Sequence, residues 1–248
     1  MSNGTEMSKR QVRREQIRRK EKRTRLIWIG IISIVAIFFA FLIIYPNVKP
    51  VGAVATAAIQ TYPQADKTAL GDPKAPIKID AYEDFQCPAC RKYTQDTEPL
   101  IIKNLIATGK VYYVFHNYPF IDGAGAGSSG ESDQAANAAM CASEQSKFWE
   151  MHATIFANWN GEGQGAYADN RLVAFAEKTG LDMTTFNSCF KSNKYKADIQ
   201  ADFDGGNKAG VQGTPSIFVN GTFVTPGYIP SYDDILKAME VAKSGSTK

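Results

Sequence analysis

The pattern of apolar and polar positions divides the chain into one uninterrupted apolar segment and a longer region of short, patterned segments. Residues 26–45, LIWIGIISIVAIFFAFLIIY, contain no charged side chain. Twenty residues of α-helix extend about 30 Å, the thickness of the hydrocarbon core of a bilayer. We therefore expect one transmembrane helix at residues 26–45, ahead of a globular region.

The globular region alternates between strand-like and helix-like patterns. Segments rich in β-branched and aromatic residues, or with period-2 alternation, predict strands at residues 77–82, 111–117, 216–219 and 222–224. Longer segments predict helices at residues 88–108, 132–156, 171–179, 183–193, 194–210 and 231–243. Pro99 should interrupt the first helix, residues 123–130 should form a loop, and Asn220-Gly221 predicts a hairpin turn.

The order of these elements predicts an α/β layered domain with a helical block inserted at about residues 131–210. We divide the chain into a basic segment (1–25), an anchor (26–45), a Pro- and Ala-rich linker (46–74) and the domain (75–245).

Charge sets the expected topology of the anchor. Ten of the 28 Lys and Arg residues and three of the 25 acidic residues precede residue 46. Basic residues stay on the cytoplasmic side, so the amino end is expected inside and the domain outside a cell membrane that the chain spans once. A cleaved signal, cut near Ala53-Val54-Ala55, is the alternative, but the apolar segment is long for one and that position lies far beyond its end.

The remaining residues exclude several classes of function. Beyond residue 45 acidic residues outnumber basic ones by four, without a basic stripe, so nucleic acid is not an expected partner. No P-loop, dinucleotide fingerprint or Ser-His-Asp set is present, and no cofactor is expected.

Chemistry is concentrated in Cys87-Pro88-Ala89-Cys90, which follows a predicted strand and begins a predicted helix. The backbone N–H groups and dipole of a helix amino end stabilise a thiolate, which makes Cys87 the expected nucleophile and Cys90 the resolving thiol. A static disulfide or half of a zinc site are the alternatives. Zinc commonly needs a second close Cys pair or histidines, and only His116 and His152 exist, so no metal is expected.

A second feature is Gly213-Thr214-Pro215, directly before a predicted strand. A cis proline there would remove a backbone donor, and its turn can lie opposite a reactive thiol. The exposed backbone of Thr214 would then pair with an extended substrate. An ordinary edge proline is the alternative.

Together, the segments EDFQCPACRKY, MCASEQSKFWEMHATIFANW, FNSCF and GVQGTPSIFVNGTFV resemble the DsbA-like thioredoxin-fold proteins of bacterial envelopes, over about residues 70–245. The resemblance implies a thioredoxin fold with a helical insertion and disulfide exchange with proteins. It places the nucleophile at Cys87, the resolving thiol at Cys90 and a cis proline at Pro215 after Thr214. It also implies a membrane quinone-linked thiol oxidase as recycling partner.

Two positions depart from that family. Ala89 stands where the best-known oxidases have His, which would make this protein less strongly oxidising. Ala81 stands six residues before the first cysteine, where many relatives carry a buried acid. Glu83 or Asp84 are candidates to relay the proton instead, and solvated loop acids are the alternative.

The other cysteines, Cys141 and Cys189, lie in predicted helices of the insertion. Similar proteins carry a bridged pair there, and the expected compartment is oxidising, so a structural disulfide is favoured over two buried free thiols. We further expect Tyr82, Phe85 and Tyr118 to line an apolar groove beside the active cysteines.

The leading functional hypothesis is a dithiol oxidase that forms disulfides in exported proteins. A reductase or isomerase would use the same fold with another redox potential and another recycling partner. A thiol-based metal carrier or chaperone-like module is the alternative from a different class.

Overall fold

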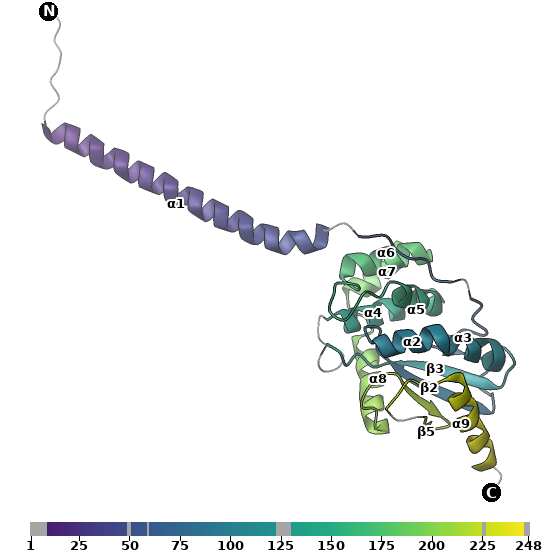
Figure 1. The fold of residues 1–248 in the computed structure, drawn as a ribbon. Coiled ribbons are helices and arrows are strands. Elements are labelled where there is room, and N and C mark those ends of the chain that lie inside the picture. Colours follow the sequence, from purple (N-terminus) through teal and green to yellow (C-terminus); the bar gives the residue numbers. More distant parts are fainter. Residues whose placement is uncertain (1–8, 49–50, 59, 123–129, 225–226, 246–248) are drawn as a thin grey trace, which may run out of the picture. The chain divides into compact units, whose positions relative to one another are not determined.

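Figure 1 shows a computed structural model of the chain, which describes residues 9–48, 51–58, 60–122, 130–224 and 227–245. The loop expected at residues 123–130 lies outside the described residues, apart from Gly130. The chain forms two compact units, Met1–Pro50 and Val51–Lys248, and each is described by itself.

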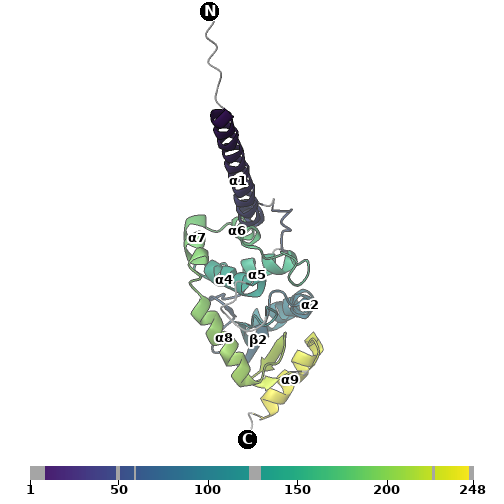
Figure 2. The ribbon, with the colours of Figure 1, turned by 90° about the vertical axis from the view of Figure 1, so that its left-hand side faces the viewer.

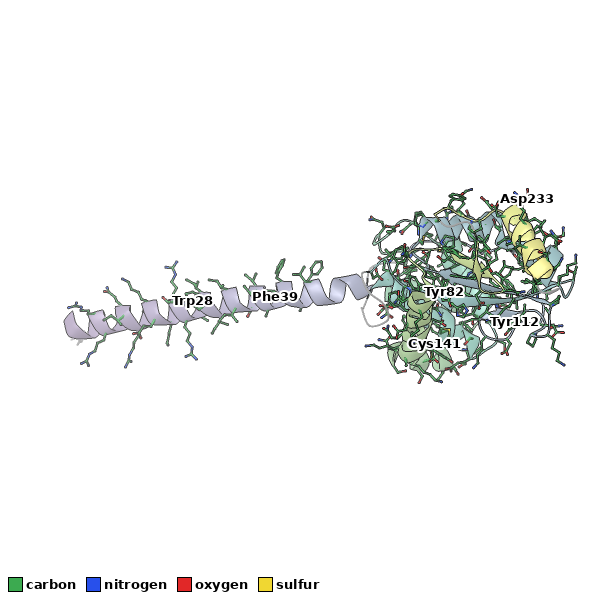
Figure 3. All side chains as sticks on the ribbon, turned by 90° about the horizontal axis from the view of Figure 1, so that it is seen from below. Trp28, Phe39, Tyr82, Tyr112, Cys141 and Asp233 are labelled. Atoms are coloured by element: carbon green, nitrogen blue, oxygen red, sulfur yellow. A yellow bond between two sulfur atoms is a disulfide. The ribbon has the colours of Figure 1, made fainter. Side chains whose placement is uncertain are left out.

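The first unit is one helix, α1 (Lys9–Val48), which extends the expected apolar helix at both ends. A stretch of this helix, Gln16–Leu42, is long and apolar enough to cross a membrane. Its apolar side chains project all around the helix, as Trp28 and Phe39 illustrate in Figure 3. A helix that exposes apolar side chains on every side matches a lipid environment, so the single N-terminal apolar helix agrees with the prediction.

The second unit is built on a five-stranded sheet with the order β1-β3-β2-β4-β5. Strand β2 pairs in parallel with β3 and antiparallel with β4, and the edge strands β1 and β5 pair antiparallel with β3 and β4. The strands are β1 (Ala69–Leu70), β2 (Ile77–Glu83), β3 (Val111–Asn117), β4 (Ser216–Val219) and β5 (Thr222–Phe223). The β4–β5 turn is the expected Asn220-Gly221, both with positive φ.

Strict alternation in the two central strands produces two different faces. Every second residue of β2 and β3, beginning at Ile77 and Val111, is buried. The apolar ones belong to the main core, to which the helices α2 (Pro88–Asp96) and α5 (Phe148–Ala157) also contribute. The intervening residues are half-buried or exposed, and helix α8 (Lys196–Ala209) contacts β3. Figure 2 shows α8 alongside β2, apart from α2.

The remaining helices are α3 (Glu98–Ile101), the π-helical turn η1 (Ile102–Ile106), α4 (Glu131–Ser143), α6 (Asp169–Thr179), α7 (Met183–Lys191) and α9 (Tyr232–Gly245). The helix expected at 88–108 is interrupted at Thr97, two residues before Pro99, as predicted. The single helix expected at 132–156 is wrong, because a turn at residues 144–147 separates α4 from α5. Ser146 there has φ of +57°, and Lys147 Nζ donates to the carbonyl oxygens of Thr179 and Gly180.

The expected linker, residues 46–74, needs a correction. From Val51 onward the chain belongs to the compact domain, and β1 lies within it. Val54 and Tyr62 pack against the main core, and Ala55 exchanges two hydrogen bonds with the Asn158 side chain. We call residues 54–62, apart from residue 59, the strap. Its few apolar anchors are spaced too irregularly to stand out as a sequence pattern.

Candidate active site

The two active-site cysteines lie where β2 leads into α2. Cys87 is the residue before the helix, with φ of −69° and ψ of 122°, and Pro88 occupies the first helical position, where no N–H is needed. Cys87 keeps 5% of its surface exposed, whereas Cys90, one turn later, is completely buried. Both thiols are free in this structure. Of the two cysteines, only Cys87 therefore keeps any surface that a macromolecular substrate can meet.

The surroundings shift the pKa values of the two thiols in opposite directions. The largest influence on the pKa of Cys87 is a hydrogen bond from the Cys90 thiol, which lowers it, whereas burial raises it. The side chain of Thr214 and the backbone N–H groups of Cys90 and Ala89 lower this pKa further. Together they lower the pKa of Cys87 to about 6. Burial, reinforced by the negative charge of Glu83 and by Cys87, raises the pKa of Cys90 well above its ordinary value. A thiolate at Cys87 beside a protonated Cys90 follows.

The Thr214-Pro215 peptide bond is cis and lies opposite the cysteines. The Cys87 sulfur lies 3.2 Å from the Thr214 carbonyl oxygen, to which the thiol donates when it is protonated. A cavity of about 410 Å³ adjoins this contact, lined by Ala89, Gly210, Gln212, Gly213, Thr214, Pro215, Ser216, Phe223, Gly227, Tyr228 and Ile229.

The prediction that Tyr82, Phe85 and Tyr118 line a groove is wrong. Phe85 is 1% exposed and packs on Phe115 in the main core. Tyr82 and Tyr118 pack against one another in the smaller apolar cluster on the other face of the sheet. Because successive side chains of a strand point to opposite faces, Tyr82 lies on the face opposite Ala81. The sequence alone does not show on which of the two faces the cysteines lie.

The two acids before the cysteines have different surroundings. The Asp84 carboxylate accepts hydrogen bonds from the backbone N–H groups of Gln86, Phe120 and Ile121 and from the Ser132 hydroxyl. Burial nevertheless raises the pKa of Asp84 to about 6. These bonds join the cysteine loop to the segment after β3, so Asp84 has a structural task that accounts for its position.

Glu83 is 1% exposed and points into the core on the cysteine side. Its Oε1 accepts a hydrogen bond from the Tyr113 hydroxyl at 3.3 Å, and its Oε2 has no partner. Burial first, and the charge of Glu98 second, raise the pKa of Glu83 well above its ordinary value. Sequence reasoning missed Tyr113, which bonds to Glu83, and Glu98, whose charge acts on Glu83, because these residues lie on three separate elements.

The other pair of cysteines is joined. Cys141 on α4 and Cys189 on α7 form a disulfide with Cα atoms 5.8 Å apart and a sequence separation of 48 residues. Both are buried within the helical insertion. The bridge therefore ties two helices that are distant in sequence.

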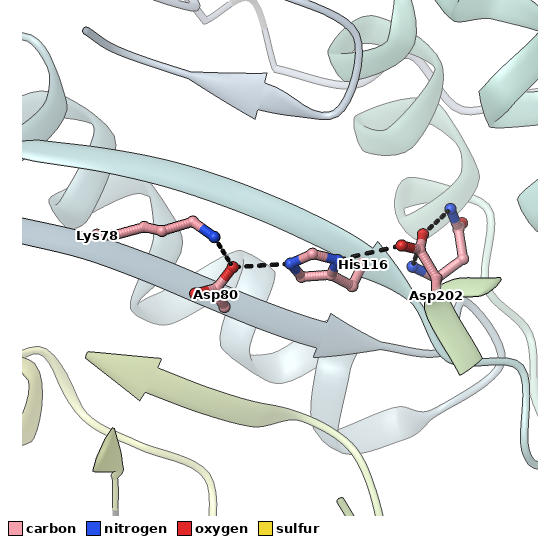
Figure 4. A network of polar contacts seen from close by, with 5 residues as sticks. Lys78, Asp80, His116 and Asp202 are labelled. Atoms are coloured by element: carbon pink, nitrogen blue, oxygen red, sulfur yellow. Dashed lines mark hydrogen bonds and ion pairs between the residues drawn. The ribbon is translucent and has the colours of Figure 1, made fainter. Parts of the chain in front are cut away.

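The histidines differ as well. His116 hydrogen bonds with Asp80 and Asp202, which links β2, β3 and α8 (Figure 4). His152 is 1% exposed among aromatic rings, and burial lowers its pKa to about 3. Within the described residues no three His, Cys, Asp or Glu side chains are grouped to hold a metal ion.

Comparison with known proteins agrees with this architecture. A thioredoxin family model matches residues 64–240. A probable disulfide bond formation protein D of Bacillus cereus is 27% identical over 183 residues, which cover 73% of this chain and 81% of the relative. A putative protein-disulfide oxidoreductase of Rickettsia prowazekii is 28% identical over 183 residues, covering 72% and 62% of the two chains.

Solved structures show the same fold. Oxidised BdbD from Bacillus subtilis superimposes with a TM-score of 0.63 at 24% identity, covering 77% of this chain and all of that one. Chlamydia trachomatis DsbA superimposes with a TM-score of 0.61 at 21% identity, covering 79% and 100%. The thioredoxin fold with a helical insertion is thus confirmed. The chain belongs to the thioredoxin family, and within it to the DsbA-like thiol–disulfide oxidoreductases.

Proposed function

We propose that this protein-disulfide oxidoreductase is a dithiol oxidase, which introduces disulfides into exported proteins through Cys87 and Cys90. The observation that carries the proposal is the opposite character of the two thiols. Cys87 keeps 5% of its surface exposed and has a pKa of about 6, whereas Cys90 is completely buried and has a raised pKa.

The reaction begins from the Cys87–Cys90 disulfide. A substrate thiolate attacks the Cys87 sulfur, the bond between the two cysteines breaks, and Cys90 leaves and takes up a proton. The second substrate thiol loses its proton and attacks the substrate sulfur of the mixed disulfide. The substrate disulfide forms, Cys87 leaves as a thiolate, and two electrons have passed to the protein.

The low pKa of Cys87 favours this direction. Lowering a thiol pKa from 9 to about 6 stabilises the reduced protein at pH 7 by about 1.4 kcal/mol. For a two-electron couple this makes the disulfide more oxidising by about 30 mV. The shift is moderate, which agrees with Ala89 in the position where strong oxidases have His.

Substrate binding is assigned to the turn at Thr214-Pro215 and the adjoining cavity. The Thr214 carbonyl oxygen is 3.2 Å from the Cys87 sulfur, so it lies beside the reacting atom. A backbone acceptor at this place suits an extended segment of a partly folded substrate, because main-chain pairing does not depend on the substrate sequence.

Glu83 is proposed to exchange the proton of Cys90. It is a buried acid whose charge acts on Cys90, and one of its oxygens is free of hydrogen bonds. Asp84, with its carboxylate occupied by four donors, is assigned the structural role instead.

The proposal places the domain outside the membrane. Helix α1 would anchor the chain by its apolar stretch, with the basic segment in the cytoplasm. Electrons would leave the reduced cysteines through a quinone-linked thiol oxidase of the same membrane. Protease added to spheroplasts should digest the domain if this topology holds, and a fully protected domain would contradict it.

The test of the function combines potential and trapping. Equilibration with glutathione should give a potential above about −200 mV, whereas a value below about −250 mV would indicate a reductase. Cys90→Ser should accumulate mixed disulfides with exported proteins, because the resolving thiol is absent. Cys87→Ser is the matched control and should trap few. Trapping by Cys87→Ser instead would reverse the assignment of the nucleophile.

A further inference from the structure

Cys90 must exchange a proton in every turnover, but water does not reach it. Its side chain has no exposed surface. Glu83, the acid proposed to act on it, is itself only 1% exposed. If Glu83 takes the proton from Cys90, a second route must connect Glu83 with solvent.

Two further side chains continue from Glu83. The Tyr113 hydroxyl donates to Glu83 Oε1 at 3.3 Å, and the Tyr113 side chain also lies close enough to the carboxyl of Glu98 to lower its pKa. Tyr113 is completely buried and Glu98 is 4% exposed, yet Glu98 Oε1 has no hydrogen-bond partner. A protonated Glu98 that donates to the Tyr113 oxygen, while Tyr113 donates to Glu83, forms one continuous row of donors and acceptors.

Glu98 also lies in the wall of a cavity. The cavity measures about 290 Å³ and is lined by Ala57, Ala58, Gln60, Tyr62, Thr94, Gln95, Glu98, Pro99, Ala153, Phe156 and Ala157. A volume of this size accommodates several water molecules. Two of the lining residues, Ala58 and Gln95, are exposed, so the cavity opens to solvent.

The strap forms the outer wall of this cavity. Ala57, Ala58, Gln60 and Tyr62 all contribute to the lining. Tyr62 packs on Trp149 with ring centroids 6.0 Å apart, and Ala55 is bonded to Asn158, so the strap is attached to the domain at two points.

We propose that Tyr113 and Glu98 conduct the Cys90 proton between Glu83 and water in the strap cavity. The inference rests on the proposed function and adds to it the route by which the Cys90 proton reaches solvent. Tyr113 and Glu98 are positioning residues for this transfer, because they act through Glu83 and do not contact the reacting sulfurs.

The charges around the row suit proton transfer. Burial raises the pKa of Glu98 to about 8 and that of Glu83 well above its ordinary value, so the pair holds protons near neutral pH. No cation neutralises the pair among the described groups that face it. His152 Nε2 lies 4.0 Å from Glu98 Oε1 but is neutral, and the phenols of Tyr62, Tyr93 and Tyr113 are kept protonated by burial.

Each turnover moves one proton along the row in each direction. When the disulfide opens, the Cys90 thiolate takes a proton from Glu83, and Glu83 takes one from Tyr113. Tyr113 is reprotonated by Glu98, and Glu98 takes a proton from water in the cavity. When Cys90 attacks a mixed disulfide at Cys87, the protons move in the reverse order and one is released to the cavity. No electron passes through the row.

The test separates the two thiol steps. Reduced full-length protein in detergent is mixed with oxidised glutathione, and the reaction is quenched and followed by mass spectrometry. Attack by Cys87 forms the glutathione mixed disulfide, and attack by Cys90 consumes it. Glu98→Gln and Tyr113→Phe should slow the second step about tenfold, within the range of general acid–base catalysis, and leave the first step unchanged. In the parent protein the second step should accelerate as the pH rises through about 8, and Glu98→Gln should shift that rise to lower pH, because the charge of Glu98 no longer raises the pKa of Glu83.

Two more variants make the result specific. Ala57→Leu fills the cavity without altering a charge and should also slow the second step alone. Glu150→Gln, an exposed position on α5, is the neutralising control and should change neither step. An unchanged first step in each variant shows that the fold and Cys87 are intact.

The outcomes distinguish this inference from the function on which it rests. A second step slowed by Glu83→Gln but unchanged in Glu98→Gln, Tyr113→Phe and Ala57→Leu overturns the route through the cavity and leaves the oxidase proposal standing. If the parent protein forms no mixed disulfide at Cys87, the proposed function itself fails.

Discussion

His116 allows a sharp prediction about stability, because one ring bridges two carboxylates. Its Nε2 lies 2.8 Å from Asp80 Oδ1 and its Nδ1 lies 3.1 Å from Asp202 Oδ1, as Figure 4 shows. The ring stacks on Tyr82 with centroids 4.5 Å apart. The perturbation is His116→Gln, which removes the positive charge between β2 and α8 and keeps a polar side chain of similar reach.

The magnitude follows from the pKa of His116. Burial lowers this pKa, but the hydrogen bonds and charges of Asp202 and Asp80 outweigh burial and raise it from 6.5 to about 9. A shift of this size corresponds to about 3 kcal/mol. Because the folded protein binds the proton more tightly, this stability is fully present below about pH 6.5 and is lost as the pH rises through about 9.

The assay is urea unfolding of the oxidised full-length protein in detergent, at several values between about pH 6 and pH 9.5. Oxidation removes the titration of Cys87 and Cys90 from the comparison. His116→Gln should cost about 3 kcal/mol at the acidic end and little at the alkaline end. Lys78→Gln, which removes the half-exposed partner of Asp80, is the control and should cost about 0.5 kcal/mol. Identical pH slopes for the parent protein and His116→Gln would refute the assignment.

Two further predictions concern packing and the insertion. Replacing both Cys141 and Cys189 by Ala opens a loop of 48 residues and should lower the free energy of unfolding by about 4 kcal/mol while sparing glutathione exchange; mass spectrometry showing two free thiols in protein isolated under thiol trapping would contradict the bridge. Gly206→Ala places a methyl group 2.7 Å from the Tyr118 ring and should destabilise by about 1–3 kcal/mol, whereas Gly205→Ala, with open space around it, should stabilise helix α8 by up to about 1 kcal/mol; equal effects in thermal unfolding would refute the close approach.

The elements that sequence reasoning located well are those specified by local chemistry. Strand β3 begins and ends where the β-branched and aromatic segment does, and the turn after β4 is the Asn-Gly pair. The start of α2 is fixed by Pro88, which suits a first helical position. Such signals act within a few residues, so they are visible without a structure.

The elements that it missed depend on contacts between distant residues. The turn between α4 and α5 is held by Lys147, whose ammonium group bonds to the carboxyl end of α6. The strap is held by Asn158, about a hundred residues away in sequence. Glu98 looks like an ordinary acid beside a proline, and only the approach of β3 gives it Tyr113 as a partner.

The geometry of strand β2 also explains why this chain can have Ala81 where many relatives carry a buried acid. Successive residues of a strand point to opposite faces, so Ala81 and Glu83 share the core face of β2. Ala81 pairs with Phe115, a fully buried ring, and brings no acid to this face. Two residues further on, at the end of the strand, Glu83 meets the Tyr113 hydroxyl and acts electrostatically on Cys90. The proton transfer proposed above therefore requires a buried acid on the core face of β2 with a polar neighbour. An acid six residues before the first cysteine meets this requirement in other proteins, and an acid at another position on the same face can meet it as well.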